Sequence, residues 1–330
     1  MTLKHWLLGP SYSTAHRVLS GEVTLDPRDV PAIVRASLDR ERPGALRTAA
    51  AAGYWWKSEL EYRARRALSI AEHYDQPVEF FRIFLDHDYR AYSGAVFDEP
   101  GMTLEAAQRR KLEMLTRKLQ AKPGHRILDI GCGWGSFLTY AREQGLDAEG
   151  ITLSAAQVDE CTRLGHKVSF GDAAESVPSP VDRIVTAGMM EHCKNQRGRI
   201  LANAYAALVP GGRMVVQELV TSSERGNLPA VVFVAEEFFR GDRVGSYKSV
   251  QRAAWKAGFR VVHLEGLGRY YVPTLLEWAR RLGERFDEAT ALVGYRTAMT
   301  YLLCFAGYAW YFDVGAVDLL QYVLVKPDSA

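Results

Sequence analysis

The sequence predicts an α/β protein built on a doubly wound, mostly parallel sheet of seven strands. From about residue 103 onward, short apolar runs alternate with helix-like stretches, a pattern typical of parallel strands joined by helices. A glycine-rich loop connects the first run to a helix, and 330 residues suffice for one large domain or two smaller ones. The expected architecture is therefore Rossmann-like, with a helical N-terminal region and helical insertions.

The seven candidate strands are short and rich in β-branched or other apolar residues. A helix over 103–120 should precede the first strand, because Thr103 is a suitable N-cap and the run KPG follows the helix. The strands are expected at 126–130, 147–151, 167–170, 183–187, 213–219, 260–264 and 320–326.

Two regions of the chain are predicted to be helical additions to the sheet domain, 91–330. The first is the N-terminal region, 1–90, in which an Asp and a Pro open an amphipathic run. The second consists of two insertions, 221–246 and 266–312. Insertions that follow strands lie at the edge where such sheets bind ligands. We therefore expect these segments to cover the site as a lid.

Bulk charge argues against a nucleic-acid-binding protein. The formal net charge is +2, far from the basic excess that a nucleic-acid groove requires. Basic clusters occur at 63–66 and 109–111. On helices such clusters usually form solvated faces, and the alternative is contact with anionic phosphates, including lipid headgroups.

Cysteine usage and hydropathy limit the location and the metal chemistry. The four cysteines form no C-x-x-C pair, so neither a metal site nor a redox motif is predicted. The apolar burst near the N-terminus is too short for a secretory signal. The longest apolar stretch, 298–312, is shorter than a membrane-spanning helix needs. We expect 298–312 to be a buried helix and the protein to be cytoplasmic, with reduced thiols.

The loop ILDIGCGWGSF, 127–137, is the candidate cofactor site. Gly131, Gly133 and Gly135 permit a tight turn and a close backbone approach to a ligand, and Asp129 ends the strand. The spacing differs from the G-x-G-x-x-G dinucleotide fingerprint, which makes NAD or FAD the weaker alternative. The pattern suits S-adenosyl-L-methionine, which carries no phosphate and whose cationic groups favour a carboxylate. Seven strands in this order suit the methyltransferase variant of the Rossmann architecture.

The second strand ends in polar residues that can reach the ribose or the methionine part of the cofactor. Its end reads AEGITLSAAQ, so Glu149 falls within the strand. Thr152, Leu153 and Gln157 are the candidate cofactor residues there. Ser154 has a simpler interpretation, as the N-cap of the next helix.

The ends of the third and fourth strands supply further candidates. Asp172, beside Ala173, can accept a hydrogen bond from the adenine amino group; the alternative is an ordinary turn aspartate. The run DRIVTAGMMEHCKN, 182–195, is an apolar strand that ends on a carboxylate. We expect Ala187 to back the cofactor and Glu191 to face the reacting carbon; the alternative is an ordinary loop.

Several motifs occur together in a fixed order. They read EHYDQPVEFFRIFLD, YSGAVF, LDIGCGWGS, ITLSAAQ, AGMMEH and YYVPTLLEWARR. The ordered set resembles the cyclopropane-fatty-acyl-phospholipid synthase family, together with its mycolic acid cyclopropane synthase and methyltransferase relatives. The resemblance covers residues 72–326, whereas residues 1–70 do not match the N-terminal domain of the family.

The resemblance implies S-adenosylmethionine-dependent methylene or methyl transfer to the C=C bond of an unsaturated fatty-acyl, lipid-like substrate. In this chemistry the alkene attacks the sulfonium methyl and a carbocation forms. A base removes a proton from the new methyl group, and the ring closes. Without ring closure the product is a methylated alkene or an alcohol. The resemblance leaves peripheral contact with a membrane and a homodimer open.

The resemblance also implies a bicarbonate ion as the proton acceptor. In the family its ligands are a cysteine, the glutamate of the EH pair, a histidine on the fifth strand, a backbone N–H two residues later and a tyrosine. Glu191, Tyr271 and the backbone of Leu219 match three of these ligands. Two positions depart, because Gly94 replaces the cysteine and Gln217 replaces the histidine.

The two departures leave two alternatives open. The backbone of Gly94 can still donate a hydrogen bond, and Gln217 can donate but cannot carry a proton. Either bicarbonate is retained with weaker binding, or Glu191 acts alone or through a water. A desolvated Glu191 is a better base, and simple methylation then competes with cyclopropanation. Tyr92 and Ser93 match family residues that contact the methionine part of the cofactor.

Aromatic residues crowd the second insertion, and most of them are expected to form the core between helices. Tyr271 is the exception, because it falls on the active-site tyrosine of the family. The remaining aromatic residues there are Tyr270, Trp278, Tyr295, Tyr301, Phe305, Tyr308, Trp310, Tyr311 and Phe312.

Three classes of function remain from the sequence. The leading one is the cyclopropane-synthase-like transferase. The second is a C-methyltransferase of secondary metabolism that acts on a non-lipid alkene, an isoprenoid or a polyketide, which the atypical N-terminus favours. The third is a family member that binds the cofactor or a lipid without turnover.

Overall fold

The computed structural model describes residues 10–40, 76–193, 195–221 and 245–328. The chain separates into two compact units. A sheet unit comprises 86–221, 244–271 and 318–330. A helical unit comprises 1–85, 222–243 and 272–317. The basic cluster at 63–66 and nearly all of the insertion 221–246 lie outside the described residues, so the structure gives no account of them.

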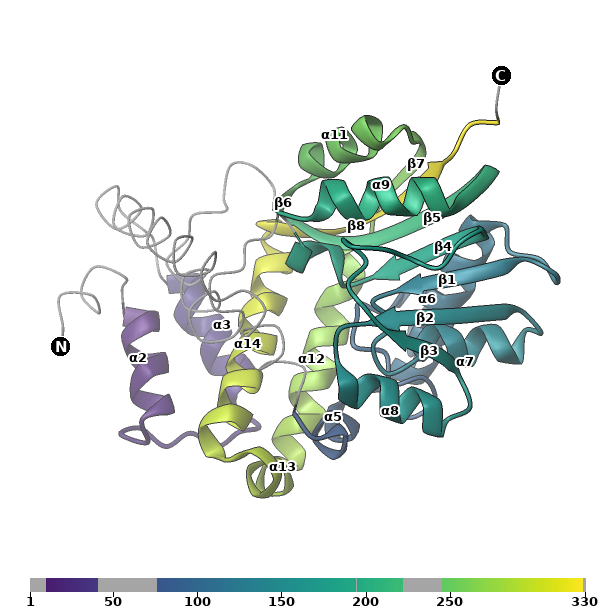
Figure 1. Cartoon of the computed structure of the whole chain (residues 1–330). Helices are drawn as coiled ribbons and strands as arrows, with labels where there is room; N and C mark the ends of the chain where they lie inside the picture. The colour runs from purple at the N-terminus through teal and green to yellow at the C-terminus, as the bar shows by residue number, and fades with distance from the viewer. Residues whose placement is uncertain (1–9, 41–75, 194, 222–244, 329–330) are drawn as a thin grey trace. The chain divides into compact units, whose positions relative to one another are not determined.

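The sheet has the order β3-β2-β1-β4-β5-β8-β7, and the short β6 pairs with β5 (Figure 1). β1 pairs with β2 and β4 in parallel, β4 with β5 in parallel, and β7 with β8 antiparallel. The α/β doubly wound prediction is confirmed, and all seven predicted strands are present. The strands are β1 Arg126–Ile130, β2 Asp147–Thr152, β3 Lys167–Phe170, β4 Val181–Ala187, β5 Leu208–Thr221, β6 Gly245–Ser246, β7 Arg260–Gly266 and β8 Val317–Val325.

β5 begins five residues earlier than the predicted start at residue 213. Its first residue, Leu208, pairs with Val181 of β4, and the next pair is Arg183 with Arg213. The run PGG between these pairs forms an irregularity in the register. Proline and glycine favour turns in sequence-based interpretation, and this bulge is the reason why the predicted strand started too late.

Helices cover both faces of the sheet, as expected for a chain in which strands and helices alternate (Figure 1). On one face, Leu112 of α6 and Tyr140 of α7 pack with Val185 and Val215. On the other face, α9 and α11 pack on Ile184 and its neighbours. The helices of this unit are α6 Leu104–Leu119, α7 Ser136–Glu143, α8 Ala155–Arg163, α9 Arg197–Ala207 and α11 Tyr247–Ala257.

α6 begins as the sequence predicts. The Thr103 hydroxyl accepts a hydrogen bond from the backbone N–H of Ala106, which satisfies one of the free donors of the first turn. The helix ends at Gln120, which adopts the left-handed conformation, φ 51°. Buried residues run along α6 from Leu104 to Leu119. Two of them, Gln108 and Lys111, are polar.

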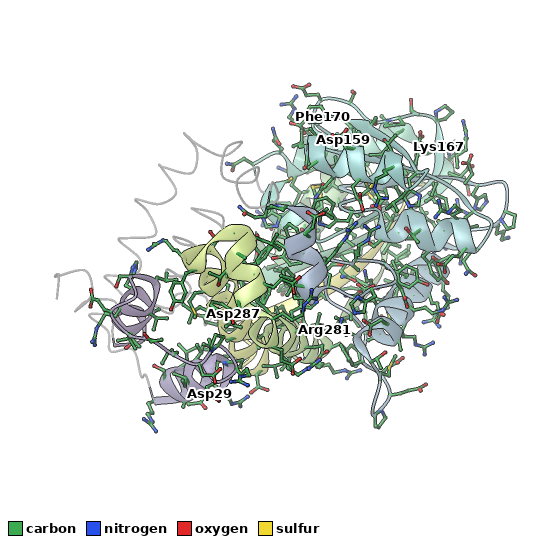
Figure 2. The ribbon with its side chains drawn as sticks, turned by 90° about the horizontal axis from the view of Figure 1, so that it is seen from below. Asp29, Asp159, Lys167, Phe170, Arg281 and Asp287 are labelled. Carbon is green, nitrogen blue, oxygen red and sulfur yellow. The ribbon has the colours of Figure 1, made fainter. Side chains whose placement is uncertain are left out.

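The helical unit has an aromatic core. Phe84 of α5 makes an edge contact with Phe305 and another with Trp278, at ring-centroid distances of 5.1 Å and 6.2 Å. The Arg281 guanidinium donates to the carbonyl of Leu85, and Figure 2 labels Arg281 on α12. The helices are α2 Pro10–Leu19, α3 Val30–Arg40, α5 Val78–Phe84, α12 Gly268–Glu284, α13 Phe286–Val293 and α14 Tyr295–Asp313.

The sequence-based interpretation of the second insertion as a helical core is confirmed for the residues that pack inside. Trp278, Tyr301, Phe305, Tyr311 and Phe312 are buried. The apolar stretch 298–312 lies within α14, a buried helix, as expected. Among the described residues, no helix combines the length and the apolar character needed to cross a membrane.

Candidate active site at the carboxyl ends of the strands

The loop after β1 adopts the glycine-dependent conformation that its sequence predicts. Gly131 and Gly133 have φ values of +76° and +55°, in the left-handed region. The N–H of Gly131 donates to the carbonyl of Ile151 at 2.8 Å, which ties the loop to β2. A Cβ built at Gly131 would lie 2.6 Å from Met189 Cγ, whereas none of the described residues comes within 4 Å of one built at Gly133. The loop therefore leaves its backbone open at Gly133.

A buried lysine lies beside the acid that ends β1. Lys111 of α6 is fully buried, and its Nζ lies 3.1 Å from Ser93 Oγ. Burial raises the pKa of Asp129 to about 7, and the Lys111 charge opposes this rise. Burial lowers the pKa of Lys111 to about 8, opposed by Asp86 and Asp129. Two carboxyl groups thus act on one cation, and the cluster carries a net negative charge when it is fully ionised, which suits a cationic ligand.

The segment before Gly94 is held by side chains instead of by a strand. The Asp86 carboxylate accepts hydrogen bonds from the backbone N–H groups of Tyr89 at 2.6 Å and Ala91 at 2.7 Å. Gln108 Nε2 donates to the carbonyl of Ser93 at 2.9 Å. Ser93 is buried, and Tyr92 beside it is half-buried. These contacts bring the two predicted methionine-binding residues to a defined place near the end of β1.

The interpretation of 109–111 as a solvated basic face is wrong for Lys111. Arg109 and Arg110 do reach solvent, where Arg110 pairs with Asp98 at 2.7 Å. Lys111 instead occupies the apolar stripe of α6, in line with Ala107 and Leu115. The spacing of Lys111 from Ala107 and Leu115 predicts a buried position, whereas its charge predicts an exposed one.

The end of β2 combines a buried polar pair with an exposed apolar side chain. Thr152 Oγ1 donates to Gln157 Oε1 at 2.6 Å, and both residues are buried. Ser154 caps α8 by accepting from the N–H of Gln157, so its simpler interpretation is confirmed. Leu153 is 51% exposed, and Phe170 at the end of the adjacent β3 is 63% exposed (Figure 2). These side chains offer an apolar surface at the strand ends.

Asp172 forms a turn after β3. Its Oδ1 accepts from the N–H of Ala174 at 2.8 Å, and its Oδ2 lies 3.4 Å from Gln196 Nε2. The residue is half-buried, and its neighbour Ala173 is buried. The turn role is therefore present, and Oδ2 remains the oxygen on which the adenine hypothesis depends.

Glu191 lies in a short 3-10 helix, Met190–Cys193, directly after β4, and it is buried. Ala187 pairs with Gln217, and the N–H of Gly188 donates to the Gln217 carbonyl at 3.0 Å, so this turn is anchored to β5. A Cβ built at Gly188 would lie 3.9 Å from Glu191 Oε1 and 3.5 Å from Ser93 Cβ. The structure thus brings Glu191 next to the predicted methionine-binding segment.

Tyr271, in the first turn of α12, completes the cluster around Gly94. A Cβ built at Gly94 would lie 3.1 Å from Tyr271 Cγ and 2.7 Å from Leu319 Cδ2. Burial, and after it the negative charge of Glu191, raise the pKa of the Tyr271 hydroxyl well above its usual value. The tyrosine ring and Leu319 therefore occupy the space that a side chain at position 94 would need.

The alternation of β5 places its polar residues on opposite faces. Gln217 lies on the α6 side, and its Nε2 is 3.4 Å from the Gly94 carbonyl oxygen. Glu218 faces α9, where Arg197 donates to its Oε2 at 3.1 Å and to the Met190 carbonyl at 3.2 Å. Burial raises the pKa of Glu218 to about 8; Arg197 lowers it and the Glu191 charge raises it further.

The structure brings together Glu191, Tyr271, Gly94 and Gln217 as the resemblance implies, with Leu219 buried on the same strand face as Gln217. Sequence reasoning missed four residues that hold them in place. Only Lys111 carried a local signal, its position in the helical stripe. The others act through the tertiary arrangement. The missed residues are Gln108, Lys111, Arg197 and Gln321.

The fold and the site together define a class of protein. A glycine-rich loop follows the first strand, an acid lies at the end of that strand and another in the short helix after the fourth, and the last strand pairs antiparallel with its neighbour. These features define a Rossmann-like, S-adenosylmethionine-dependent methyltransferase.

Comparison with known proteins narrows this class. Residues 61–322 match the family model described as mycolic acid cyclopropane synthetase. Cyclopropane mycolic acid synthase 2 from Mycobacterium leprae is 33% identical over 288 residues, which are 78% of this chain and 93% of the relative. The chain therefore belongs to the mycolic acid cyclopropane synthetase family, whose members are transferases.

Two solved structures are similar over most of the chain. The cyclopropane synthase MmaA2 from Mycobacterium tuberculosis has a TM-score of 0.74 at 30% identity, covering 79% of this chain and 98% of that one. The mycolic acid cyclopropane synthase CmaA1, complexed with SAH and CTAB, has a TM-score of 0.73 at 30% identity with the same coverage.

Proposed function

We propose that this protein transfers a methylene or methyl group from S-adenosyl-L-methionine to the C=C bond of an unsaturated fatty-acyl chain. The observation that carries the proposal is the cluster of Glu191, Tyr271 and Gly94 next to the segment held by Lys111. The lipid substrate is inferred from the names of the relatives, which are cyclopropane mycolic acid synthases.

The residues present fit the cofactor. Asp129 and Asp86 supply two carboxyl groups against the single cation of Lys111, which favours a ligand with ammonium and sulfonium charges. The open backbone at Gly133 allows close approach, and the exposed Leu153 and Phe170 can cover the adenosine. When bound, S-adenosylmethionine supplies an electrophilic methyl group. Other proposed contacts come from the side chains or backbone of Tyr92, Ser93, Gly131, Gly135, Thr152, Gln157, Asp172, Ala173 and Ala187.

Glu191 is the proposed proton acceptor. Methyl transfer leaves a carbocation on the acyl chain, and loss of a proton from the new methyl group provides the electron pair that closes the ring. A buried carboxylate is a stronger base than one in water, because burial disfavours its charge. Tyr271, whose raised pKa keeps the hydroxyl protonated, donates a hydrogen bond and offers an aromatic face to the cation.

The same cluster supplies ligands for an oxyanion. Gln217 Nε2 and the N–H groups of Gly94 and Leu219 are donors, and they would hold bicarbonate with Tyr271 beside Glu191. Depletion of bicarbonate tests this part of the proposal. A lower rate supports a bound anion, whereas an unchanged rate means that Glu191 accepts the proton without it.

The insertions 221–246 and 266–312 are the proposed lid over the substrate. An acyl chain requires an apolar site, and the aromatic residues of 266–312 would contribute to one. Peripheral contact with a membrane and a homodimer belong to the same proposal. The alternative, a C-methyltransferase for a non-lipid alkene, an isoprenoid or a polyketide, gains no support from these relatives.

Incubation with S-adenosylmethionine labelled in its methyl group and a bacterial lipid extract tests the proposal. We expect label in the fatty-acyl fraction, released as fatty-acid methyl esters one CH₂ heavier than the substrate. Boiled protein and the Glu191→Gln variant serve as controls. Absence of label from every acyl species, with S-adenosylhomocysteine still bound by the protein, would overturn the lipid assignment.

A further inference from the structure

A row of polar side chains crosses the sheet beneath α6 and ends at Gly94. Lys118 of α6 donates to Gln321 Oε1 on β8, and Gln321 Nε2 donates to Gln217 Oε1 on β5 at 2.7 Å. Gln217 Nε2 in turn faces the Gly94 carbonyl at 3.4 Å. Gln217 and Gln321 are both 0% exposed. Buried amides are costly unless they are hydrogen-bonded, so the row is a built feature of the core.

The chemistry of the first member fixes the direction of every bond in the row. An ammonium has three donors and no acceptor, so the amide oxygen of Gln321 must face Lys118. The amide NH₂ of Gln321 then faces β5, where it donates to the amide oxygen of Gln217. The reversed orientation would place an NH₂ group against the ammonium. Orientation of an amide is normally ambiguous, but here the cation at one end of the row and the Gly94 carbonyl, an acceptor, at the other require the same arrangement.

The charge on Lys118 is itself held in place at the solvent end. Glu265, which pairs with Gln321 in the register of β7 and β8, forms an ion pair with the Lys118 ammonium. Burial lowers the pKa of Lys118, and the Glu265 carboxylate opposes this change. His263, two residues before Glu265, lies 3.6 Å from the Glu265 carboxylate and is half exposed. The row therefore runs from the sheet edge to the site.

We infer that Lys118, acting through Gln321, is a positioning residue that keeps the amide of Gln217 turned with its N–H groups toward Gly94 and the reaction site. A terminal amide has two N–H donors, so Gln217 can donate to Gly94 and to a bound oxygen atom at once. Position 217 then serves the site as a donor only, never as an acceptor or a base. The inference rests on the proposed function, because it assigns Gln217 a role in the same site.

Two substitutions should change the orientation of the Gln217 amide, one by reversing it and one by leaving it unconstrained at the Gln321 end. Gln321→Glu replaces the donor that faces Gln217 with a carboxylate oxygen, which accepts from Gln217 Nε2 and turns that amide around. Lys118→Met removes the cation that sets the direction. Lys118→Arg retains a cation that can only donate, and it should rescue the effect. Lys122→Met, an exposed lysine after the same helix, is the matched control.

Steady-state kinetics on the lipid fraction that the wild type labels give the first readout. We expect kcat of Gln321→Glu to fall by about tenfold or more, the effect of losing a hydrogen bond to a charged group in the transition state. The KM for S-adenosylmethionine should stay near the wild-type value, and so should kcat of Lys118→Arg and Lys122→Met. A Gln321→Glu variant that binds S-adenosylhomocysteine normally and keeps the wild-type kcat would overturn the inference.

Neutron diffraction from the deuterated protein bound to S-adenosylhomocysteine gives a second readout, which needs no turnover. We expect two deuterons on the Gln217 amide atom nearest Gly94 and none on the atom nearest Gln321. The opposite arrangement refutes the inference even if the enzyme is active. If the wild type labels no lipid, the proposed function fails, while neutron maps of the wild type and of Lys118→Met still decide whether Lys118 sets the orientation of the Gln217 amide.

Discussion

Lys111 and Lys118 lie two helical turns apart on α6, and both point toward the sheet, but their partners differ. Lys111 lies within electrostatic reach of the carboxyl groups of Asp86 and Asp129. Lys118 meets the neutral amide of Gln321 and an ion-pair partner at the sheet edge. The first arrangement sets a charge and suits the cationic cofactor. The second sets the direction of hydrogen bonds and suits the reacting end of the site.

The difference teaches that a buried lysine can have two kinds of effect, one on the protonation of nearby carboxyl groups and one on the direction of hydrogen bonds. A buried charge acts on the protonation of its neighbours: burial raises the pKa of Asp129 to about 7, and the Lys111 charge opposes this rise. A chain of amides passes on no charge but fixes which atom faces the site. The two ends of the site should therefore respond to different perturbations.

The largest expected effect is at the reacting end. Glu191→Gln keeps the shape of the side chain but removes its basicity, and loss of a general base typically lowers kcat by about 10²–10⁴-fold. Binding of S-adenosylhomocysteine should be little changed, because the cofactor end is intact. Calorimetry and single-turnover assays measure the two effects. The exposed Glu288→Gln, from a surface pair with Arg285, is the control. If Glu191→Gln weakens cofactor binding more than it lowers kcat, the proposed division of the site into a cofactor end and a reacting end is wrong.

The next effect is on stability at the cofactor end. Lys111→Met removes the hydrogen bond to Ser93 Oγ and the cation that acts on Asp86 and Asp129, and loss of a hydrogen bond from a charged group costs about 1.5–3 kcal/mol in the free energy of unfolding. Urea denaturation measures this loss. Arg110→Met removes an exposed pair with Asp98 and should cost about 1 kcal/mol or less. Equal stabilities of the two variants would mean that the cluster around Lys111 holds no charge.

Crowding at Gly94 gives a smaller effect. Gly94→Ala adds a Cβ that would lie 2.7 Å from Leu319 Cδ2 and 3.1 Å from Tyr271 Cγ. Such overpacking usually costs about 1–3 kcal/mol, and displacement of Tyr271 should also lower kcat. Thermal melting and kinetics follow both changes. The double variant with Leu319→Val should recover part of the stability. An alanine that is tolerated without loss would show that position 94 has room for a side chain.

The smallest effect is the dependence of cofactor affinity on pH. Burial raises the pKa of Asp129 to about 7, so the carboxyl group is largely protonated below that pH and ionised above it. A cationic cofactor prefers the ionised form, so affinity should rise with pH up to about 7, and the range below 7 separates this step from the titration of Lys111, whose pKa is about 8. Below pH 7 the change should approach, at most, about tenfold per pH unit. Calorimetric titration of S-adenosylmethionine from pH 5.5 to 8.5 measures this dependence. Asp129→Asn should bind more weakly with a flat profile, and a wild-type profile that is equally flat would contradict the proposed charge of the cluster.

Much of the fold could be predicted because its signals are local. The alternation of apolar runs and helices located all seven longer strands, and Thr103 marked the start of α6. β5 was the exception, since the bulge at its PGG run reads as a turn in sequence. Glu191 and Tyr271 were located through the resemblance, and the structure places them within electrostatic reach of each other.

The supporting residues could not be predicted in the same way. Gln321 is 104 positions away from Gln217, and the two meet only because β8 lies beside β5 in the sheet order. Lys118 reaches them from α6, which precedes every strand. No periodicity or motif indicates such a contact. Arg197 likewise binds the Met190 carbonyl and Glu218 through the packing of α9 on the sheet.

The most direct test of the central claim uses S-adenosylmethionine with a fully deuterated methyl group and mass spectrometry of the acyl chains. We predict that a cyclopropanated chain retains two of the three deuterons, because Glu191, alone or through a bound bicarbonate, accepts one from the transferred methyl group as the ring closes. Acyl chains without deuterium would contradict the proposed transfer. Retention of all three deuterons would contradict the assignment of Glu191 as the base that acts on the new methyl group.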